Sequence, residues 1–331
     1  MTHKTMKQVL TKKVNEWLEH IDDAEVRAVI EENLVITGGC FTSFISREKP
    51  NDYDCYFRTK AAAATVAQYY INAWNAAHPA QTNKLGKACG VMLADGDNLS
   101  QEVLDYFQVS RPEDSKAVMI SNIEPGRLKI IFPSDGVVGN PDDVRAPEEL
   151  GTAVENVTEV DEVAAGEVIE QERKRYFPVF ISSNAITLSD GIQLIVRFYG
   201  EPDSIHDTFD FEHTKAYWMP GHPVVIPNSV YECVTNKVLR YTGSKYPVCS
   251  LFRLRKFIAR GWHINAGQIL KMAMQVSELD LSDINTLEDQ LIGVDSLYFM
   301  ELIHQFRRQK AGDPDFALTS AYIVSIIDKI F

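Results

Sequence analysis

The feature that most constrains this chain is an apolar run that ends in a pair of glycines. Residues 34–37 are apolar or β-branched, and Gly38 and Gly39 follow them directly. This pattern predicts a buried strand that turns sharply into a helix, because glycine tolerates the backbone angles of a tight turn. Backbone N–H groups at the start of such a helix, together with the Ser43 hydroxyl, form a cradle for a phosphate group.

Two aspartates one residue apart follow this turn. Asp52 and Asp54 flank Tyr53, with Cys55 and Phe57 next on the other side of the predicted strand. Residues i and i+2 of a strand point to the same face, so the two carboxylates would meet at one point. Carboxylates that close repel each other unless a cation lies between them. Mg²⁺, which prefers oxygen ligands and substrate phosphates, is the expected cation, with Mn²⁺ as an alternative.

This layout resembles the nucleotidyltransferase superfamily, typified by DNA polymerase beta and the CCA-adding enzymes. Its signature is an apolar residue, Gly-Gly or Gly-Ser, a spacer, and then Asp-x-Asp flanked by apolar positions; here the spacer is residues 40–51. The resemblance implies that Gly38, Gly39 and Ser43 hold the triphosphate of an incoming nucleotide. It also implies that Asp52 and Asp54 hold the metal ions.

Members of that superfamily carry a third carboxylate on a later strand. Residues 185–199, with a turn at Ser189-Asp190-Gly191, give a hairpin signal, and residues 203–208 predict one short helix. Residues 209–214 then alternate aromatic and polar side chains, which predicts a strand. Asp210 is the first candidate for the third ligand, and Asp207 and Glu212 are the alternatives.

A block of basic residues follows. Residues 233–277 contain eight Lys or Arg and no Asp or Glu. Part of this block resembles the arginine-rich helix of CCA-adding enzymes and bacterial poly(A) polymerases, although Lys256 replaces an arginine of that pattern and the aromatic comes earlier. Guanidinium groups on one helix face bind phosphates in a bidentate manner or stack on a base. The candidate phosphate-binding residues are Lys237, Arg240, Arg253 and Lys256.

The acidic charge of the chain is concentrated in one segment. Residues 135–172 hold twelve acids and one arginine, a local charge of −11 out of a total of −13. A chain that coats nucleic acid is expected to be basic overall, so this class is disfavoured. The segment reads as an insertion: a solvated linker between sheet elements, or alternatively a mimic of nucleic acid or a shield over the basic block.

The order of elements predicts an α/β (α+β) chain. A nucleotidyltransferase domain with a mixed sheet is expected at residues 1–228, with the acidic insertion at about 135–172, and a helical domain at residues 229–331. The expected helices lie at 5–20, 23–32, 60–78, 229–242, 249–260, 265–276, 287–292, 295–310 and 318–330. Strands are expected at 116–121, 127–132, 177–199 and 209–217.

These features predict an enzyme that moves a nucleoside monophosphate from an NTP to an acceptor hydroxyl. The acceptor is left open between an RNA 3′ end such as that of tRNA, a protein, a small molecule and a second nucleotide. Two rival interpretations are an inactive member that binds nucleotide or nucleic acid, and an interaction protein with an acidic loop. The five cysteines have no paired spacing, and no apolar run reaches the roughly 18 residues of a membrane span. A cytoplasmic protein with no membrane contact is therefore expected.

Overall fold

The chain divides into two compact units. In this computed structural model, unit 1 comprises Met1–Lys7, Val35–Pro50 and Gly200–Phe331, and unit 2 comprises Gln8–Leu34 and Asn51–Tyr199. The structure describes residues 1–78, 80–82, 88–101, 103–104, 125–132, 138–139, 175–291, 306, 309, 312, 319 and 321–325.

Unit 2 is built on a mixed sheet. Its strands lie in the order β2, β10, β9, β8 and β7; β2 and β10 run parallel, and each later pair is antiparallel. The bounds are β2 (Tyr53–Phe57), β10 (Ile192–Tyr199), β9 (Ala185–Leu188), β8 (Pro178–Ile181) and β7 (Val138–Gly139). The mixed α/β class and the hairpin at residues 185–199 are thereby confirmed.

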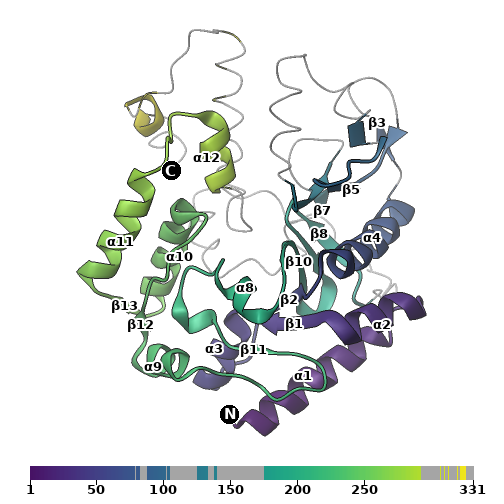
Figure 1. Ribbon diagram of the computed structural model, residues 1–331, viewed down its shortest axis with the longest axis horizontal. Coiled ribbons are helices and arrows are strands. Elements are labelled where there is room, and N and C mark those ends of the chain that lie inside the picture. Colours follow the sequence, from purple (N-terminus) through teal and green to yellow (C-terminus); the bar gives the residue numbers. More distant parts are fainter. Residues whose placement is uncertain are drawn as a thin grey trace, which may run out of the picture. The chain divides into compact units, whose positions relative to one another are not determined.

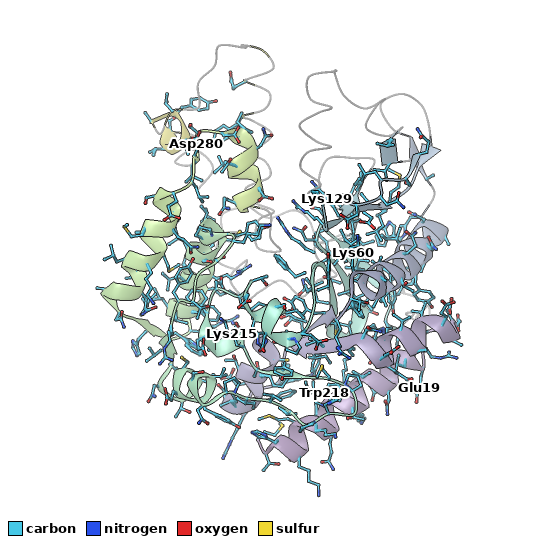
Figure 2. All side chains as sticks on the ribbon, viewed as in Figure 1. Glu19, Lys60, Lys129, Lys215, Trp218 and Asp280 are labelled. Carbon is cyan, nitrogen blue, oxygen red and sulfur yellow. The ribbon has the colours of Figure 1, made fainter. Side chains whose placement is uncertain are left out.

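Helices cover this sheet in unit 2. The helix α4 (Lys60–Ala77) packs on β2 and β10 (Figure 1) and contacts α2 (Ala24–Asn33). The Trp17 indole N–H of α1 (His3–Leu18) donates to the Tyr70 hydroxyl of α4 at 2.6 Å, and both rings are buried. Two short antiparallel pairs complete the described strands of unit 2: β3 (Gln81–Thr82) with β4 (Ala88–Cys89), and β5 (Met92–Asp95) with β6 (Leu128–Ile131). At the start of α4, Lys60, labelled in Figure 2, donates to Asp95 at 2.8 Å.

Unit 1 combines two short strand pairs with several helices. The strand β1 pairs antiparallel with β11, and β12 pairs parallel with β13. The bounds are β1 (Leu34–Thr37), α3 (Gly39–Ser46), α8 (Pro202–His206), β11 (Tyr217–Trp218), α9 (Asn228–Asn236), β12 (Val238–Leu239), α10 (Pro247–Ala259), β13 (His263–Ile264), α11 (Ala266–Ser277) and α12 (Ile284–Leu291). Among the described residues, no helix is long and apolar enough to cross a membrane.

Two of the sequence expectations are wrong. Residues 209–217 do not form one strand: Phe211 makes an isolated bridge with Tyr241, Glu212–Thr214 form a 3₁₀ turn, and only Tyr217–Trp218 are extended in β11. The helix expected at 229–242 ends at Asn236, because Lys237 adopts a left-handed conformation with φ 49°. The strand expected at 116–121 and most of the acidic insertion and of the helices at 295–310 and 318–330 lie outside the described residues. The domain division at residue 228 stays a prediction.

Candidate functional site

The turn between β1 and α3 forms one part of the candidate site. Gly38 has φ 92° and ψ −152°, angles that glycine reaches because it lacks a Cβ atom. Its N–H donates to the Thr214 carbonyl at 3.2 Å. A Cβ atom added at the exposed Gly39 would find no atom within 4 Å. The predicted turn from strand to helix is therefore confirmed, and Ser43 lies one helical turn beyond Gly39 on the same side of α3.

A buried hydrogen-bond network holds Thr37, the residue that precedes this turn. The Thr37 hydroxyl donates to the Ala216 carbonyl at 2.7 Å and lies 2.9 Å from Nε2 of His206. A hydroxyl has one hydrogen, so Nε2 of His206 must be the donor to the Thr37 oxygen. Burial, aided by the nearby Lys215 charge, lowers the pKa of His206 to about 4. A neutral histidine thus holds the residue that precedes Gly38, a role that no pattern in the sequence indicated.

The aspartate pair stands at the start of β2 in unit 2. Asp52 precedes the strand and is exposed, whereas Asp54 lies within it, half-buried and in register with Gln193 of β10. Burial raises the pKa of the Cys55 thiol, the Asp54 carboxylate raises it further, Lys13 opposes this shift, and Asp52 adds to it. Both carboxylates therefore lie close enough to Cys55 to act on its thiol. Cys55 and Phe57 are buried as predicted, but Tyr56 between them is buried as well and Tyr53 is half-buried, so β2 does not show the expected alternation.

A glycine turn supports the strand end that carries Asp52. Gly191 has φ +78°, and a Cβ atom built there would lie 2.9 Å from the Asn51 carbonyl oxygen. Gly191→Ala is therefore expected to lower the free energy of unfolding by roughly 1–2 kcal/mol, through backbone strain and the clash with Asn51. Urea unfolding of the variant tests this expectation. Gly221→Ala is the matched control: Gly221 has a similar φ of +80° but nothing within 4 Å of the added atom. An equal loss in both variants would show that the contact with Asn51 has no effect.

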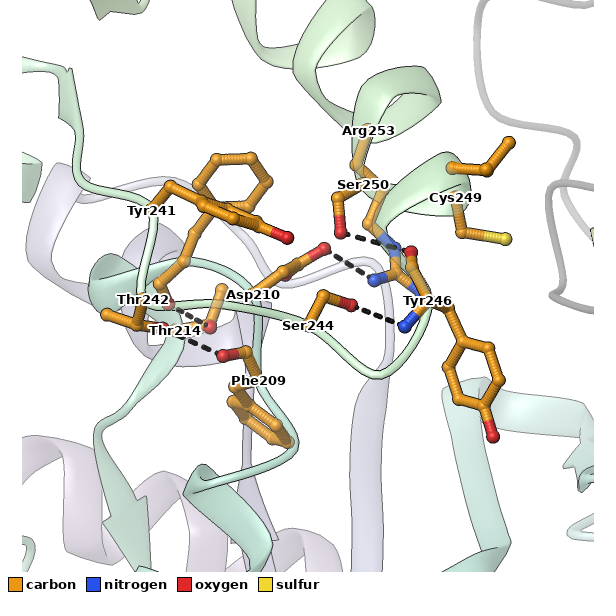
Figure 3. A network of polar contacts seen from close by, with 12 residues as sticks. Phe209, Asp210, Thr214, Tyr241, Thr242, Ser244, Tyr246, Cys249, Ser250 and Arg253 are labelled. Carbon is orange, nitrogen blue, oxygen red and sulfur yellow. Dashed lines mark hydrogen bonds and ion pairs between the residues drawn. The ribbon is translucent and has the colours of Figure 1, made fainter. Parts of the chain in front are cut away.

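Asp210 belongs to unit 1 and does not lie on a strand. Its buried carboxylate accepts a hydrogen bond at 2.6 Å from Nη1 of Arg253 on α10 (Figure 3). Its carbonyl accepts the Thr242 N–H. The alternatives are placed elsewhere in unit 1: Glu212 accepts the Ser229 hydroxyl at 2.5 Å, and the exposed Asp207 caps the end of α8. The structure thus joins two residues that the sequence assigned to different tasks, metal binding and phosphate binding.

The ion pair between Asp210 and Arg253 is expected to contribute to stability. Arg253→Met would leave the buried Asp210 carboxylate without this partner, at a cost of roughly 2 kcal/mol. Asp210→Asn would leave only a half-exposed guanidinium, at a cost of about 1 kcal/mol. A double-mutant cycle in urea tests this, and the double variant is expected to lose less than the two single losses together. Strictly additive losses of unfolding free energy would contradict an energetic coupling between Asp210 and Arg253.

The other basic candidates lie along the same part of unit 1. The helix expected at 249–260 is observed as α10, and Lys256 is half-buried one turn beyond Arg253. Arg240 forms an exposed ion pair with Glu232 at 3.7 Å, and the exposed Lys237 terminates α9. Arg240 and Arg253 therefore already have an acidic partner each.

His213 is a buried polar residue that takes no part in the ion pair of Asp210 and Arg253. Its ring lies 4.6 Å from the Phe257 ring and 4.5 Å from the Trp262 ring, between centroids. Neither ring nitrogen has a hydrogen-bond partner among the described residues. Burial lowers the pKa of His213 to about 4, although the Asp210 charge opposes this shift. The histidine therefore stays neutral at physiological pH and packs as an aromatic residue.

The sequence-predicted site residues fall into two groups. Asp52 and Asp54 belong to unit 2, and Gly38, Gly39, Ser43, Asp210 and the basic residues belong to unit 1. Within the described part of the chain, no group of three His, Cys, Asp or Glu side chains is placed to hold a metal ion. A pair of carboxylates nevertheless fits Mg²⁺, which is usually held by one or two carboxylates together with substrate phosphates.

Comparison with known proteins places the chain in a family. Residues 8–233 match the family described as Gabija anti-defense 2 family protein. The chain belongs to the Gabija anti-defense 2 family. The matched span includes Gly38, Gly39, Asp52, Asp54 and Asp210, and it ends before the basic residues of α10. None of the curated proteins matches the chain.

Proposed function

We propose that this protein is a metal-dependent nucleotidyltransferase of the cytoplasm, with a nucleotidyltransferase domain that carries the Gly-Gly turn and the aspartate pair. The observation that carries the proposal is the pair Asp52 and Asp54, held at one end of a strand whose following residues are buried. The turn from β1 through Gly38 into α3 supports it, because that turn presents the N–H groups of a helix N-terminus beside the open space at Gly39.

In the proposed reaction, the oxygen of an acceptor hydroxyl attacks the α-phosphorus of an NTP. A new bond forms between that oxygen and the α-phosphorus, the bond from the α-phosphorus to the bridging oxygen breaks, and pyrophosphate leaves. The hydroxyl proton passes to a carboxylate or to solvent. The N–H groups at the start of α3 and the Ser43 hydroxyl would hold the triphosphate.

Asp52 and Asp54 would hold Mg²⁺ or Mn²⁺ together with oxygens of the triphosphate. When bound, the ion lowers the pKa of the acceptor hydroxyl and neutralises charge on the leaving pyrophosphate. Asp210 stays the proposed third carboxylate, and its bond to Arg253 means that the guanidinium would have to leave before Asp210 could bind a cation. Lys237, Arg240, Arg253 and Lys256 are the proposed contacts to phosphate.

The acceptor is proposed by class. An RNA 3′ end such as that of tRNA, a protein hydroxyl and a small molecule all supply the required nucleophile. The family name connects its members with countering a defence called Gabija. We therefore propose that nucleotide transfer by this protein acts against that defence, and that the proteins of the defence belong among the acceptors to be tested.

Incorporation of label from each α-³²P ribonucleotide tests the proposal. The protein is incubated with Mg²⁺ or Mn²⁺ and with total tRNA, with the purified proteins of the named defence, or alone. Asp52→Ala/Asp54→Ala is the control, after circular dichroism shows that it is folded. Label that appears with the wild type and disappears in the variant supports the proposal, and the labelled species identifies the acceptor. Triphosphate binding without label would favour the inactive member, and no binding with no label would favour an interaction protein.

A further inference from the structure

The helix α11 has its apolar face turned to solvent. Its exposed side chains include Ile269, Leu270 and Met274, which are 46%, 62% and 59% exposed. With the exposed Ala266 and Ala273 they recur at the spacing of one helix face. We call these five residues the α11 face. Helices of soluble proteins usually expose their polar side, so this arrangement is reversed.

Polar residues of α11 fix it in this orientation. The Gln268 side-chain oxygen accepts the Tyr241 N–H at 2.9 Å. The Gln275 side-chain oxygen accepts the Tyr241 hydroxyl at 2.5 Å and the Ser244 N–H at 3.1 Å. Met272 is fully buried on the same side. Rotating the helix to bury the α11 face would break these bonds, so the apolar exposure is built into the packing of unit 1.

Basic side chains lie on α11 and on the neighbouring α10, and the acidic Glu278 lies at the C-cap of α11. Lys271 is exposed on α11, and Arg255 and Arg260 are exposed on the neighbouring α10 and at its end. No acid occurs in residues 233–277, and the first acids beyond are Glu278 and Asp280. Asp280, labelled in Figure 2 beyond the end of α11, already accepts hydrogen bonds from Ser282. A complementary surface would be apolar at its centre and acidic at its rim.

We propose that the α11 face is a docking surface for a protein partner that presents an apolar helix flanked by Asp and Glu. An amphipathic helix recognised in this way places side chains at i, i+3, i+4 and i+7 against an apolar surface. A second copy of the same face is disfavoured, because it would set Lys271 and the α10 arginines against like charges. RNA is disfavoured, because Ile269, Leu270 and Met274 offer nothing to phosphate. This inference does not depend on the proposed nucleotide transfer.

A designed peptide provides the probe. It is a labelled amphipathic helix with leucines at i, i+3, i+4 and i+7 and glutamates on both flanks, and its binding to the full chain is measured by fluorescence anisotropy. Leu270→Glu/Met274→Glu is expected to weaken binding at least tenfold. Ala76→Glu/Ala77→Glu, which adds the same charge at exposed positions of α4, is expected to leave binding unchanged. A peptide with lysine in place of glutamate is expected to bind at least tenfold more weakly than the acidic one.

Three results would overturn the inference. The first is that the acidic peptide does not bind, or binds the Leu270→Glu/Met274→Glu variant as well as the wild type. The second is that the wild type self-associates in sedimentation and this variant does not, which assigns the face to a second copy. The third is that a single-stranded RNA binds the wild type, loses affinity for the variant and displaces the peptide. Label incorporation, followed in parallel, separates the two proposals: its absence with intact peptide binding contradicts nucleotide transfer alone.

Discussion

Asp52→Asn and Asp54→Asn are each expected to lower the rate of nucleotide transfer by about 100-fold or more while the protein stays folded. Binding of a cation between two carboxylates is worth several kcal/mol in the transition state, and about 3 kcal/mol corresponds to a rate factor of that size. Asparagine keeps the shape of the side chain and one oxygen but removes the charge. Initial rates of label incorporation under saturating Mg²⁺ measure the effect.

The matched control for these variants is Asp22→Asn, which removes one exposed carboxylate from unit 2 without touching β2. It is expected to keep full activity. Urea unfolding of all three variants separates chemistry from stability, and changes within about 0.5 kcal/mol are expected for the exposed Asp22 and Asp52. An unfolded Asp52→Asn or Asp54→Asn protein, or a folded one with wild-type activity, would contradict a metal-binding role for the pair.

Local patterns in the sequence were enough to predict two of the turns. The turn from β1 into α3 follows from an apolar run and two glycines, because only glycine reaches φ 92° at Gly38 without strain. The hairpin of β9 and β10 follows from the turn at Ser189–Gly191. Each of these two sequence patterns lies within a few residues of the turn that it predicts, so neither prediction depends on a contact with a distant segment.

The strand predicted around Asp210 is wrong because the backbone of this segment forms its hydrogen bonds with a segment distant in sequence. Alternating aromatic and polar residues predicted a strand, yet Asp210 and Phe211 are both buried. The Glu212 N–H donates to the Arg240 carbonyl, and the Thr242 N–H donates to the Asp210 carbonyl. These bonds span about thirty residues of sequence and replace a regular ladder with a single bridge. The bond from Arg253 to Asp210 joins residues 43 positions apart and has no local signal.

The same reason explains the shortened helix after residue 228. The sequence predicts Val238 and Leu239 as helical, but they pair with His263 and Ile264 in a parallel pair of strands. The left-handed Lys237 ends α9 just before this pair begins. Tertiary pairing thus overrides the helical preference of a short segment.

The second large effect is expected from acid, because two histidines in the described part of unit 1 are buried in the neutral form. The protein is expected to lose roughly 2–3 kcal/mol of unfolding free energy per buried histidine between pH 7.5 and pH 4.5. His206 and His213 each have a pKa of about 4 when folded, lowered from 6.5 chiefly by burial. Between these values the unfolded chain binds protons that the folded chain does not. Stability is therefore fully present above pH 6.5 and falls as the pH decreases toward 4.

The groups that face each histidine determine how far this effect extends. Lys215 adds to the lowering of the pKa of His206, whereas Asp203, Glu212 and Asp207 oppose it. Asp210 opposes the lowering at His213. The pKa values of Asp97 and Asp280 are lowered below 3.8 by hydrogen bonds. The stability that those two carboxylates contribute is lost only at lower pH. The loss of unfolding free energy caused by the histidines can therefore be measured separately, between pH 7.5 and pH 4.5.

Two substitutions divide this acid sensitivity between the histidines. His213→Phe keeps an aromatic ring between Phe257 and Trp262 and removes two ring nitrogens that lack a partner among the described residues, so it is expected to be neutral or stabilising at pH 7.5. His206→Gln keeps an N–H donor for the Thr37 hydroxyl and removes the titrating group. Each variant is expected to lose about half of the difference in unfolding free energy between pH 7.5 and pH 4.5, measured by urea unfolding at both values. The exposed His222→Gln is the control and is expected to keep the full difference. If both buried-site variants keep it as well, groups other than these two histidines govern the acid response of the protein.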